Sequence, residues 1–317
     1  MTQPPYPPYG EPPRPDEDAR PGCWWHPHTP TGLSCVRCGR PACPDCLRDA
    51  SVGQQCIDCV EAARAQQRQA QPLRPGGRTV AGARVSTRPV VMPVLIALNV
   101  LLYVVTAAQV GDPMQNNEST LFQDGQLWPL AIHIDGEWTR LLMSGFLHYG
   151  LLHLAMNMLA LWILGRDLEL LLGRVRFLAL YLVSLLGGST AVYLLGSVNT
   201  GTAGASGAVY GLMGALLVAV LKLRLNPGGA IGIIAINLVL TVTLPGISLL
   251  GHLGGLVAGA LVMIAMLYAP EKQRTQFQLT TVALLVALLV GLILYRDATI
   301  ASAICTELPY LCPGTTV

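Results

Sequence analysis

Seven apolar stretches after residue 89 constrain this chain more than any other feature. A membrane-spanning helix needs about 20 predominantly apolar residues. Only 12% of the 317 residues are charged and 52% are hydrophobic, proportions that exclude an ordinary soluble domain. We therefore expect an all-α polytopic membrane protein whose spans reach or approach the required length at residues 90–109, 148–164, 177–196, 204–221, 230–245, 248–269 and 277–295. The fifth stretch is the shortest.

The distribution of basic residues predicts the orientation of these spans. Cytoplasmic flanks collect lysine and arginine. With the N-terminus inside, 18 of the 20 basic residues lie on the cytoplasmic side, and only Arg140 and Arg296 lie outside. This pattern predicts a multi-pass protein with a cytoplasmic N-terminus and an external C-terminus. The net charge of +2 then reflects topology, so we expect no nucleic-acid partner.

The residues before the first span divide into three segments. Residues 1–22 form a Pro-rich tail that we expect to be disordered, and residues 61–88 are typical of a flexible linker. No apolar run occurs in the first 89 residues, so no cleavable signal peptide is expected. The bias toward Ala, Arg, Gly and Pro favours a GC-rich bacterial genome, and with it a location in the plasma membrane.

Residues 23–60 contain four pairs of metal-ligand residues. Each pair has two residues between its members, the spacing that lets two ligands hold one tetrahedral zinc ion. The pairs are Cys23 and His26, Cys35 and Cys38, Cys43 and Cys46, and Cys56 and Cys59. A disulfide framework is the alternative, but the predicted topology places the segment in the reducing cytosol, where disulfides are rare. The pattern predicts two structural zinc ions.

The arrangement resembles the B-box and other small cross-braced zinc domains. This resemblance implies that the first and third pairs share one ion and that the second and fourth pairs share the other. Sequential pairing and the replacement of His26 by His28 remain alternatives. With all ligand positions filled by protein, the module is expected to be structural and to dock a protein partner or substrate. Beyond the last span, the pairing of Cys305 with Cys312 in a disulfide is left open.

Polar residues within the apolar stretches are costly and usually functional. His153 and Asn157 are four residues apart in the second stretch and share a helical face. Ser206 begins the fourth stretch, and His252 lies near the outer end of the sixth. In the predicted topology all four lie within about two helical turns, roughly 10 Å, of the outer surface. They can therefore meet in one layer.

These residue types together indicate acyl-transfer chemistry. A histidine can take the proton of a serine hydroxyl as it attacks, and an amide and a second histidine can donate to an oxyanion. Ser206 alone would more often be a packing residue. Tyr210 shares the face of Ser206, and glycine stripes on both helices would let their backbones approach closely: Gly207, Gly211 and Gly214 on one and Gly255 and Gly259 on the other.

Three motifs resemble those of the rhomboid family of intramembrane serine proteases. "GASGAVYGLMGA" is similar to its Gly-x-Ser-Gly motif, with Gly204, Ser206 and Gly207 matching. "HYGLLHLAMNM" resembles its His-x4-His-x3-Asn motif, and "HLGGLVAG" its His-x2-Gly-x3-Gly motif. "GEWTRLLMSGFLH" resembles its Trp-Arg segment, with Thr139 standing between Trp138 and Arg140.

The resemblance implies a Ser206–His252 dyad without an acidic third member. It also implies that Asn157 and His153 stabilise the oxyanion with the Ser206 backbone N–H, and that Tyr210 packs on the His252 ring. His148 is expected to be structural. The implied organisation is a six-span protease core at residues 89–271, a seventh transmembrane helix at 272–296 and an outer tail at 297–317, and the implied substrates are transmembrane proteins in the lipid bilayer.

Two other functions are consistent with parts of this pattern. An inactive rhomboid-like protein would bind membrane clients, but such proteins usually lack the dyad. A transporter would use buried polar groups along its path, but neither repeated halves nor paired carboxylates occur here. Both alternatives therefore explain less of the sequence than a protease does.

Overall fold

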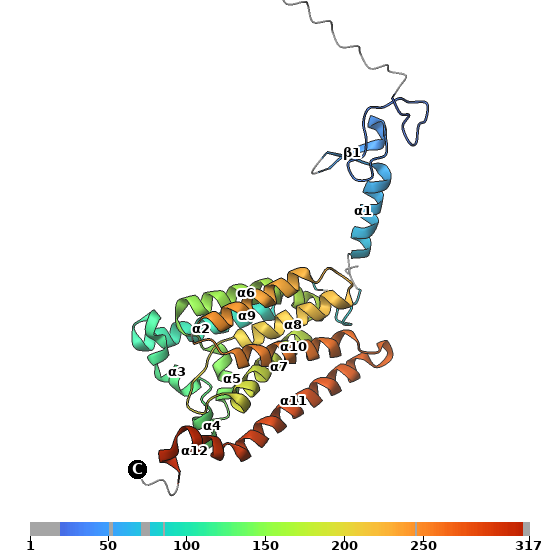
Figure 1. Cartoon of the computed structure of the whole chain (residues 1–317). Helices are drawn as coiled ribbons and strands as arrows, with labels where there is room; N and C mark the ends of the chain where they lie inside the picture. Colours follow the sequence, from blue (N-terminus) through green and yellow to red (C-terminus); the bar gives the residue numbers. More distant parts are fainter. Residues whose placement is uncertain (1–19, 51–52, 71–76, 85, 245, 313–317) are drawn as a thin grey trace, which may run out of the picture. The chain divides into compact units, whose positions relative to one another are not determined.

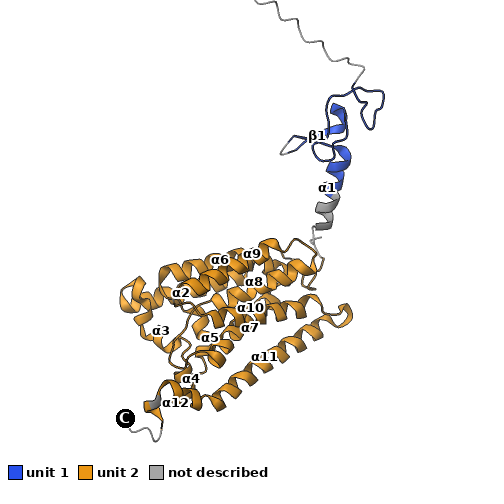
Figure 2. Cartoon of the chain, in the orientation of Figure 1, with its two compact units in different colours: residues 1–72 blue, residues 73–317 orange. Residues whose placement is uncertain are grey.

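The computed structural model describes residues 20–50, 53–70, 77–84, 86–244 and 246–312. It divides into two compact units, residues 1–72 and 73–317 (Figure 2). Most of the Pro-rich tail predicted at 1–22, and the last five residues of the predicted outer tail, lie outside the described residues.

The N-terminal unit is a small fold built around cysteines. A 3₁₀ turn, η2 (Pro44–Cys46), leads into β1 (Leu47–Asp49), which pairs antiparallel with β2 (Gln54–Cys56), and α1 (Ile57–Ala70) follows. Five cysteines make up most of its buried cluster, joined by Ala42 and Leu47. So small an apolar core stabilises a fold poorly, and units of this size usually need disulfides or metal ions.

Among the residues that the structure describes, a helix overlaps each of the seven predicted stretches. Five are long and apolar enough to cross a membrane: α2 (Val91–Val110), α6 (Gly150–Leu172), α7 (Arg174–Leu195), α10 (Leu249–Leu267) and α11, within the apolar stretch Glu271–Thr299. The other two, α8 (Ser206–Lys222) and α9 (Gly228–Thr243), are apolar but shorter, at 17 and 16 residues. The protein is therefore a helical, multi-pass membrane protein.

The seven helices are buried to very different extents. Within the most apolar window of each helix, α7 is 61% buried, whereas α11 (Arg274–Thr299) is only 11% buried. α7, α8 and α10 pack closely on one another, and α11 runs along the outside of α7 and α10 (Figure 1). This arrangement agrees with a six-helix core to which a seventh helix is added. The large apolar side chains left exposed on α11, such as Leu284 and Leu288, suit a lipid solvent.

The segment between α2 and α6 consists of short helices. They are η3 (Pro113–Glu118), α3 (Thr120–Gly125), α4 (Pro129–Asp135), α5 (Arg140–Met143) and η4 (Ser144–Phe146). The Arg140 side chain is 4% exposed and donates to the carbonyls of Gln123 and Gln126 and to the Glu137 carboxylate. The arginine of the predicted Trp-Arg segment thus holds this connection together.

Part of the predicted linker is helical or packed. α1 extends to Ala70, and Thr79 and Ala81 are buried within the second unit. The Gln278 amide of α11 donates to the carbonyl of Ala81 at 3.2 Å and to that of Met266 at 2.9 Å. A short segment before the first span therefore belongs to the helical unit.

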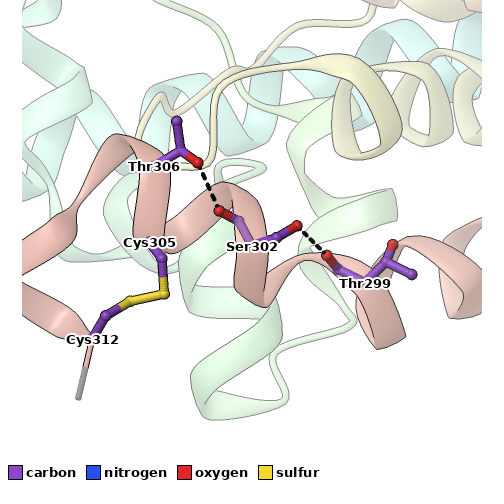
Figure 3. The surroundings of a disulfide bond; sticks show 5 residues. All are labelled: Thr299, Ser302, Cys305, Thr306 and Cys312. Carbon is purple, nitrogen blue, oxygen red and sulfur yellow. Dashed lines mark hydrogen bonds between the residues drawn. A yellow bond between two sulfur atoms is a disulfide. The ribbon is translucent and has the colours of Figure 1, made fainter. Parts of the chain in front are cut away.

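A disulfide joins Cys305 and Cys312 beyond the last span (Figure 3). Cys305 lies in α12 (Ala301–Glu307), and the turn η6 (Pro309–Leu311) brings Cys312 back toward it. The Glu307 carboxylate accepts hydrogen bonds from the Ser197 hydroxyl at 2.6 Å and the Val198 N–H at 3.1 Å. The tail is thereby attached to the connection between α7 and α8.

A buried carboxylate joins α6 to the start of α2. α6 continues eight residues past the predicted end of its span, and Glu169, 2% exposed, lies in this extension. Its carboxylate accepts from the N–H groups of Val90, Val91 and Met92 at 2.7, 2.9 and 2.8 Å. The first N–H groups of a helix have no partner within it and attract negative charge, so Glu169 caps α2.

We expect Glu169→Gln to lower the free energy of unfolding by about 2 kcal/mol, because a neutral amide oxygen replaces a charged acceptor of three buried N–H groups. Unfolding in mixed SDS and detergent micelles measures the change. Asp167→Asn is the matched control, because Asp167 is exposed on the same helix. Equal stability of the two variants would show that the capping charge contributes nothing.

Candidate functional site

Ser206 is the first residue of α8, and Gly204 determines where that helix begins. Gly204 has φ of +142°, a conformation that only glycine adopts readily. A Cβ atom at Gly204 would lie 2.7 Å from His153 Cε1 and 3.6 Å from Ser206 Oγ. The imidazole of His153 and the hydroxyl of Ser206 therefore both border the same glycine.

His252 lies in the first turn of α10 and is 6% exposed. Its ring stacks on Tyr210, with centroids 4.0 Å apart and planes at 16°. Tyr210 is four residues after Ser206 in α8, so the two side chains share one helical face. The face of α8 that carries Ser206 thus meets the face of α10 that carries His252, and the expected packing of Tyr210 on the histidine ring is present.

A threonine on a third helix completes the surroundings of His252. Thr241 of α9 is 4% exposed, and its Oγ1 lies 2.7 Å from His252 Nδ1 and 2.7 Å from the Tyr210 hydroxyl. Sequence reasoning missed Thr241. The sequence marks Thr241 only as a hydroxyl residue in an apolar stretch. Thr243 has the same property, so the sequence does not distinguish the two.

The glycines of α8 and α10 let the two backbones touch. A Cβ at Gly255 would lie 1.9 Å from the carbonyl oxygen of Gly207, and one at Gly259 would lie 2.2 Å from that of Gly211. Any side chain at these positions would push the helices apart. This close approach places Tyr210, which shares the helical face of Ser206, against the His252 ring.

Gly255→Ala should therefore lower the free energy of unfolding by about 1–3 kcal/mol, the usual effect of overpacking. The same measurement on Gly232→Ala gives the control, because a Cβ at Gly232, on α9, meets nothing within 4 Å. A Gly255→Ala protein as stable as Gly232→Ala would mean that α8 and α10 separate without cost.

The two predicted oxyanion residues lie one turn apart on α6. The Asn157 side chain is 6% exposed, and one of its N–H groups donates to the His153 carbonyl at 2.9 Å. His153 Nδ1 accepts from the Tyr149 N–H at 3.3 Å. An amide nitrogen carries two hydrogens, so Asn157 retains a second one for a ligand.

His148, just before α6, contacts both His153 and Ala205, the residue that precedes α8. Its Nε2 accepts from the Ala205 N–H at 3.4 Å, and its ring meets that of His153 edge-on with centroids 5.2 Å apart. His148 thus holds the residue that precedes Ser206, which agrees with the structural role expected for it.

A small pocket with a mixed polar and apolar lining adjoins Ser206. Its volume is about 50 Å³, enough for a few water molecules. Hydroxyl and glycine residues dominate its lining: Ser144, Ser189, Thr202, Ser206, Ser248, Gly145, Gly188, Gly204, Gly207 and Gly251. Water can therefore be held beside the serine.

The N-terminal unit brings the eight predicted ligands together in two groups. One contains Cys23, His26, Cys43 and Cys46, and the other contains Cys35, Cys38, Cys56 and Cys59, with the ligand atoms of each group within 4.8 Å of one another. This is the cross-braced grouping rather than the sequential one, and it uses His26 rather than His28.

The spacing and acidity of these groups fit a metal ion. His26 Nδ1 lies 3.4 Å from Cys43 Sγ and from Cys46 Sγ, and Cys38 Sγ lies 3.7 Å from Cys56 Sγ. Tetrahedral ligands at a Zn–S distance of about 2.3 Å are separated by about 3.7 Å. Burial and the neighbouring thiols raise the pKa of Cys46 and of Cys59 to about 12, whereas, despite burial, hydrogen bonds from backbone N–H groups lower the pKa of Cys23 and of Cys35 to about 6. Each group therefore contains a thiol that is ionised at neutral pH and one that becomes a thiolate there only beside a cation.

The fold and the site together define a multi-pass helical membrane protein in which a serine and a histidine lie on facing helices. The Rhomboid domain profile matches residues 135–269, a segment that contains every predicted dyad and oxyanion residue. The chain belongs to the rhomboid family.

Three relatives illustrate this similarity. Rhomboid protease GluP of Bacillus subtilis is 35% identical over 223 residues, 69% of this chain and 43% of GluP. Rhomboid protease AarA of Providencia stuartii is 27% identical over 65% of this chain and 82% of AarA. YdcA of Bacillus subtilis is 32% identical over 44% of this chain and 72% of YdcA. The chain thus spans less than half the length of GluP.

Proposed function

We propose that this protein is an intramembrane serine protease that cleaves transmembrane segments near the outer membrane face. Ser206 is the nucleophile and His252 its base. The observation that carries the proposal is the stacking of His252 on Tyr210, one turn from Ser206 on the same face of α8. Relatives named rhomboid proteases, GluP and AarA, support the reaction class.

The reaction proceeds through an acyl-enzyme. Ser206 Oγ attacks the substrate carbonyl while His252 Nε2 takes the hydroxyl proton, and the C–N bond breaks as the imidazolium returns that proton to the leaving amine. Water from the adjoining pocket then attacks the ester, giving a proton to His252, and Ser206 leaves with a proton from the imidazolium.

The oxyanion needs donors on the side of the carbonyl opposite His252. The backbone N–H of Ser206, the second N–H of Asn157 and the His153 ring supply them. The backbone N–H belongs to the first turn of α8, where no helical carbonyl accepts it. The supporting residues Gly204, Gly207, Gly255 and Gly259 act by letting the helices and the loop approach.

The N-terminal unit is proposed to hold two structural zinc ions and to dock a protein partner. The donor set of seven thiols and one imidazole is typical of zinc, and each group has four protein ligands, with no position left for water. Trp24 is 59% exposed and Val36 is 59% exposed, which supports a docking role. The zinc module comprises residues 23–60.

The proposed orientation has the N-terminus in the cytoplasm and the C-terminus outside the plasma membrane. The distribution of basic residues supports it, and so does the Cys305–Cys312 disulfide, because disulfides persist in oxidising compartments. The core then comprises residues 89–271 and the added helix 272–296.

Labelling of the purified protein in proteoliposomes with a fluorophosphonate probe tests the function. We expect one modified residue, Ser206, identified by mass spectrometry of the peptide that contains it, together with cleavage of a reporter fused across a transmembrane segment. Labelling at another serine, or the same cleavage after Ser206 is blocked, would refute the proposed nucleophile.

A further inference from the structure

The Thr241 hydroxyl lies at the centre of three hydrogen bonds. It donates to the Asn237 carbonyl in its own helix at 2.8 Å, and it lies 2.7 Å from both the Tyr210 hydroxyl and His252 Nδ1. Thr241 and Ala230 are the buried residues of α9, whose other side chains are exposed or partly exposed. Thr241 is therefore the buried polar residue of a helix whose side chains are mostly exposed, and its contacts with Tyr210 and His252 indicate a specific role.

The directions of these three bonds follow from the hydrogens available. A threonine hydroxyl has one hydrogen and two acceptor lone pairs. The Asn237 carbonyl has no hydrogen to give, so the Thr241 hydrogen points toward it. In the arrangement that satisfies all three contacts, the other two partners both donate to Thr241. In this arrangement His252 carries its hydrogen on Nδ1, and its lone pair lies on Nε2.

This tautomer is the one that the proposed reaction needs. Only an Nε2 without hydrogen can accept the proton of Ser206, and in the other tautomer that position is blocked. In Ser-His-Asp triads a carboxylate bonded to Nδ1 holds the histidine in this state. A threonine does so without bringing a charge into the apolar interior, where an unpaired carboxylate would be costly.

We propose that Thr241 is a positioning residue for His252: it selects the Nδ1–H tautomer and fixes the plane of the ring against Tyr210. The proposal rests on the proposed role of His252 as base. Thr241 would then be the third residue of the series Ser206, His252 and Thr241, and it lies on α9, a helix that carries none of the residues predicted for the site.

The chain offers a matched control in the same helix. Thr243 is exposed, and its hydroxyl donates to the carbonyls of Val239 and Leu240 at 2.8 and 3.4 Å. Both threonines thus bond to a carbonyl four residues back, but only Thr241 also reaches the histidine.

The test compares kcat and KM of Thr241→Val, Thr241→Ala, Thr241→Ser and Thr243→Val with wild type in proteoliposomes. We expect Thr241→Val and Thr241→Ala to lower kcat about tenfold or more with KM within about twofold, because an acceptor of the catalytic histidine is lost. Thr241→Ser should stay within about threefold of wild type, and Thr243→Val should be unchanged.

The serine and alanine variants both lack the methyl group and differ in the hydroxyl alone, so their ratio isolates it even if Thr241→Val does not fold. Equal kcat for these two variants would overturn the proposal. Nitrogen NMR of histidine-labelled protein, assigned by difference with His252→Asn, gives a readout independent of activity. An Nε2–H signal for wild-type His252 would also overturn the proposal.

These outcomes separate the inference from the proposed function. Wild-type cleavage that Ser206→Ala abolishes establishes the protease, whatever the Thr241 variants do. A wild-type protein that cleaves no transmembrane reporter and reacts with no probe would remove the proposed function, and the positioning role with it.

Discussion

Ser206→Ala should lower the cleavage rate of a transmembrane reporter by a factor of about 10⁴ or more, to the background of empty proteoliposomes. The reason is chemical: without Oγ no acyl-enzyme forms, and the remaining donors only bind the substrate. His252→Ala should lower the rate to a similar level. The double variant should be no slower than either single variant, because the two residues act as one unit.

Initial rates of product formation, measured at equal amounts of folded protein, check these values. Ser302→Ala is the matched control, because Ser302 is exposed on α12 and its hydroxyl donates to the Thr299 carbonyl (Figure 3). Its rate should equal that of wild type. Cleavage by Ser206→Ala at a tenth of the wild-type rate or more would require another nucleophile.

The helical architecture could be predicted because its causes are local. Apolar length specifies a membrane span, and each of the seven predicted stretches overlaps a helix. The approach of α8 to α10 also had a local signal, since glycines recur on one face of each helix. The pairing of the zinc-module ligands came from a resemblance, and their spacing alone left two arrangements open.

The contacts that escaped prediction join distant parts of the chain. Glu169 caps α2, whose N-cap residue Val90 lies 79 residues earlier in the chain. Thr241 reaches Tyr210 across 31 residues, and its own sequence neighbourhood resembles that of Thr243. Which side chains of two helices come into contact depends on the rotation of each helix about its axis. The hydropathy of the sequence does not specify that rotation. The span containing Asn157 was also predicted too short, because Arg166 and Asp167 interrupt the apolar run while the helix continues.

Removal of the two proposed zinc ions should unfold the N-terminal unit and leave the helical unit intact. The buried cluster of this unit consists mainly of cysteines, so little apolar burial remains when the ions are gone. We expect a strong chelator to release two zinc ions per chain and to make residues 20–60 sensitive to protease. The unfolding of the helical unit in mixed micelles should not change, since its hydrophobic core is formed within residues 73–317.

The two groups should also depend on each other. The ligand pairs alternate along the chain, so the segment from Cys35 to Cys38 lies between the two pairs that form the other group. Cys35→Ser should therefore lower the zinc content to one or less and weaken the remaining site, whereas His28→Ala, which alters an exposed histidine outside both groups, should retain two ions. Metal analysis and limited proteolysis measure both effects. We expect this coupling because ligands arranged in a cross-braced order share the chain that connects them. A Cys35→Ser protein that keeps one ion at wild-type affinity would show instead that the two sites fold separately.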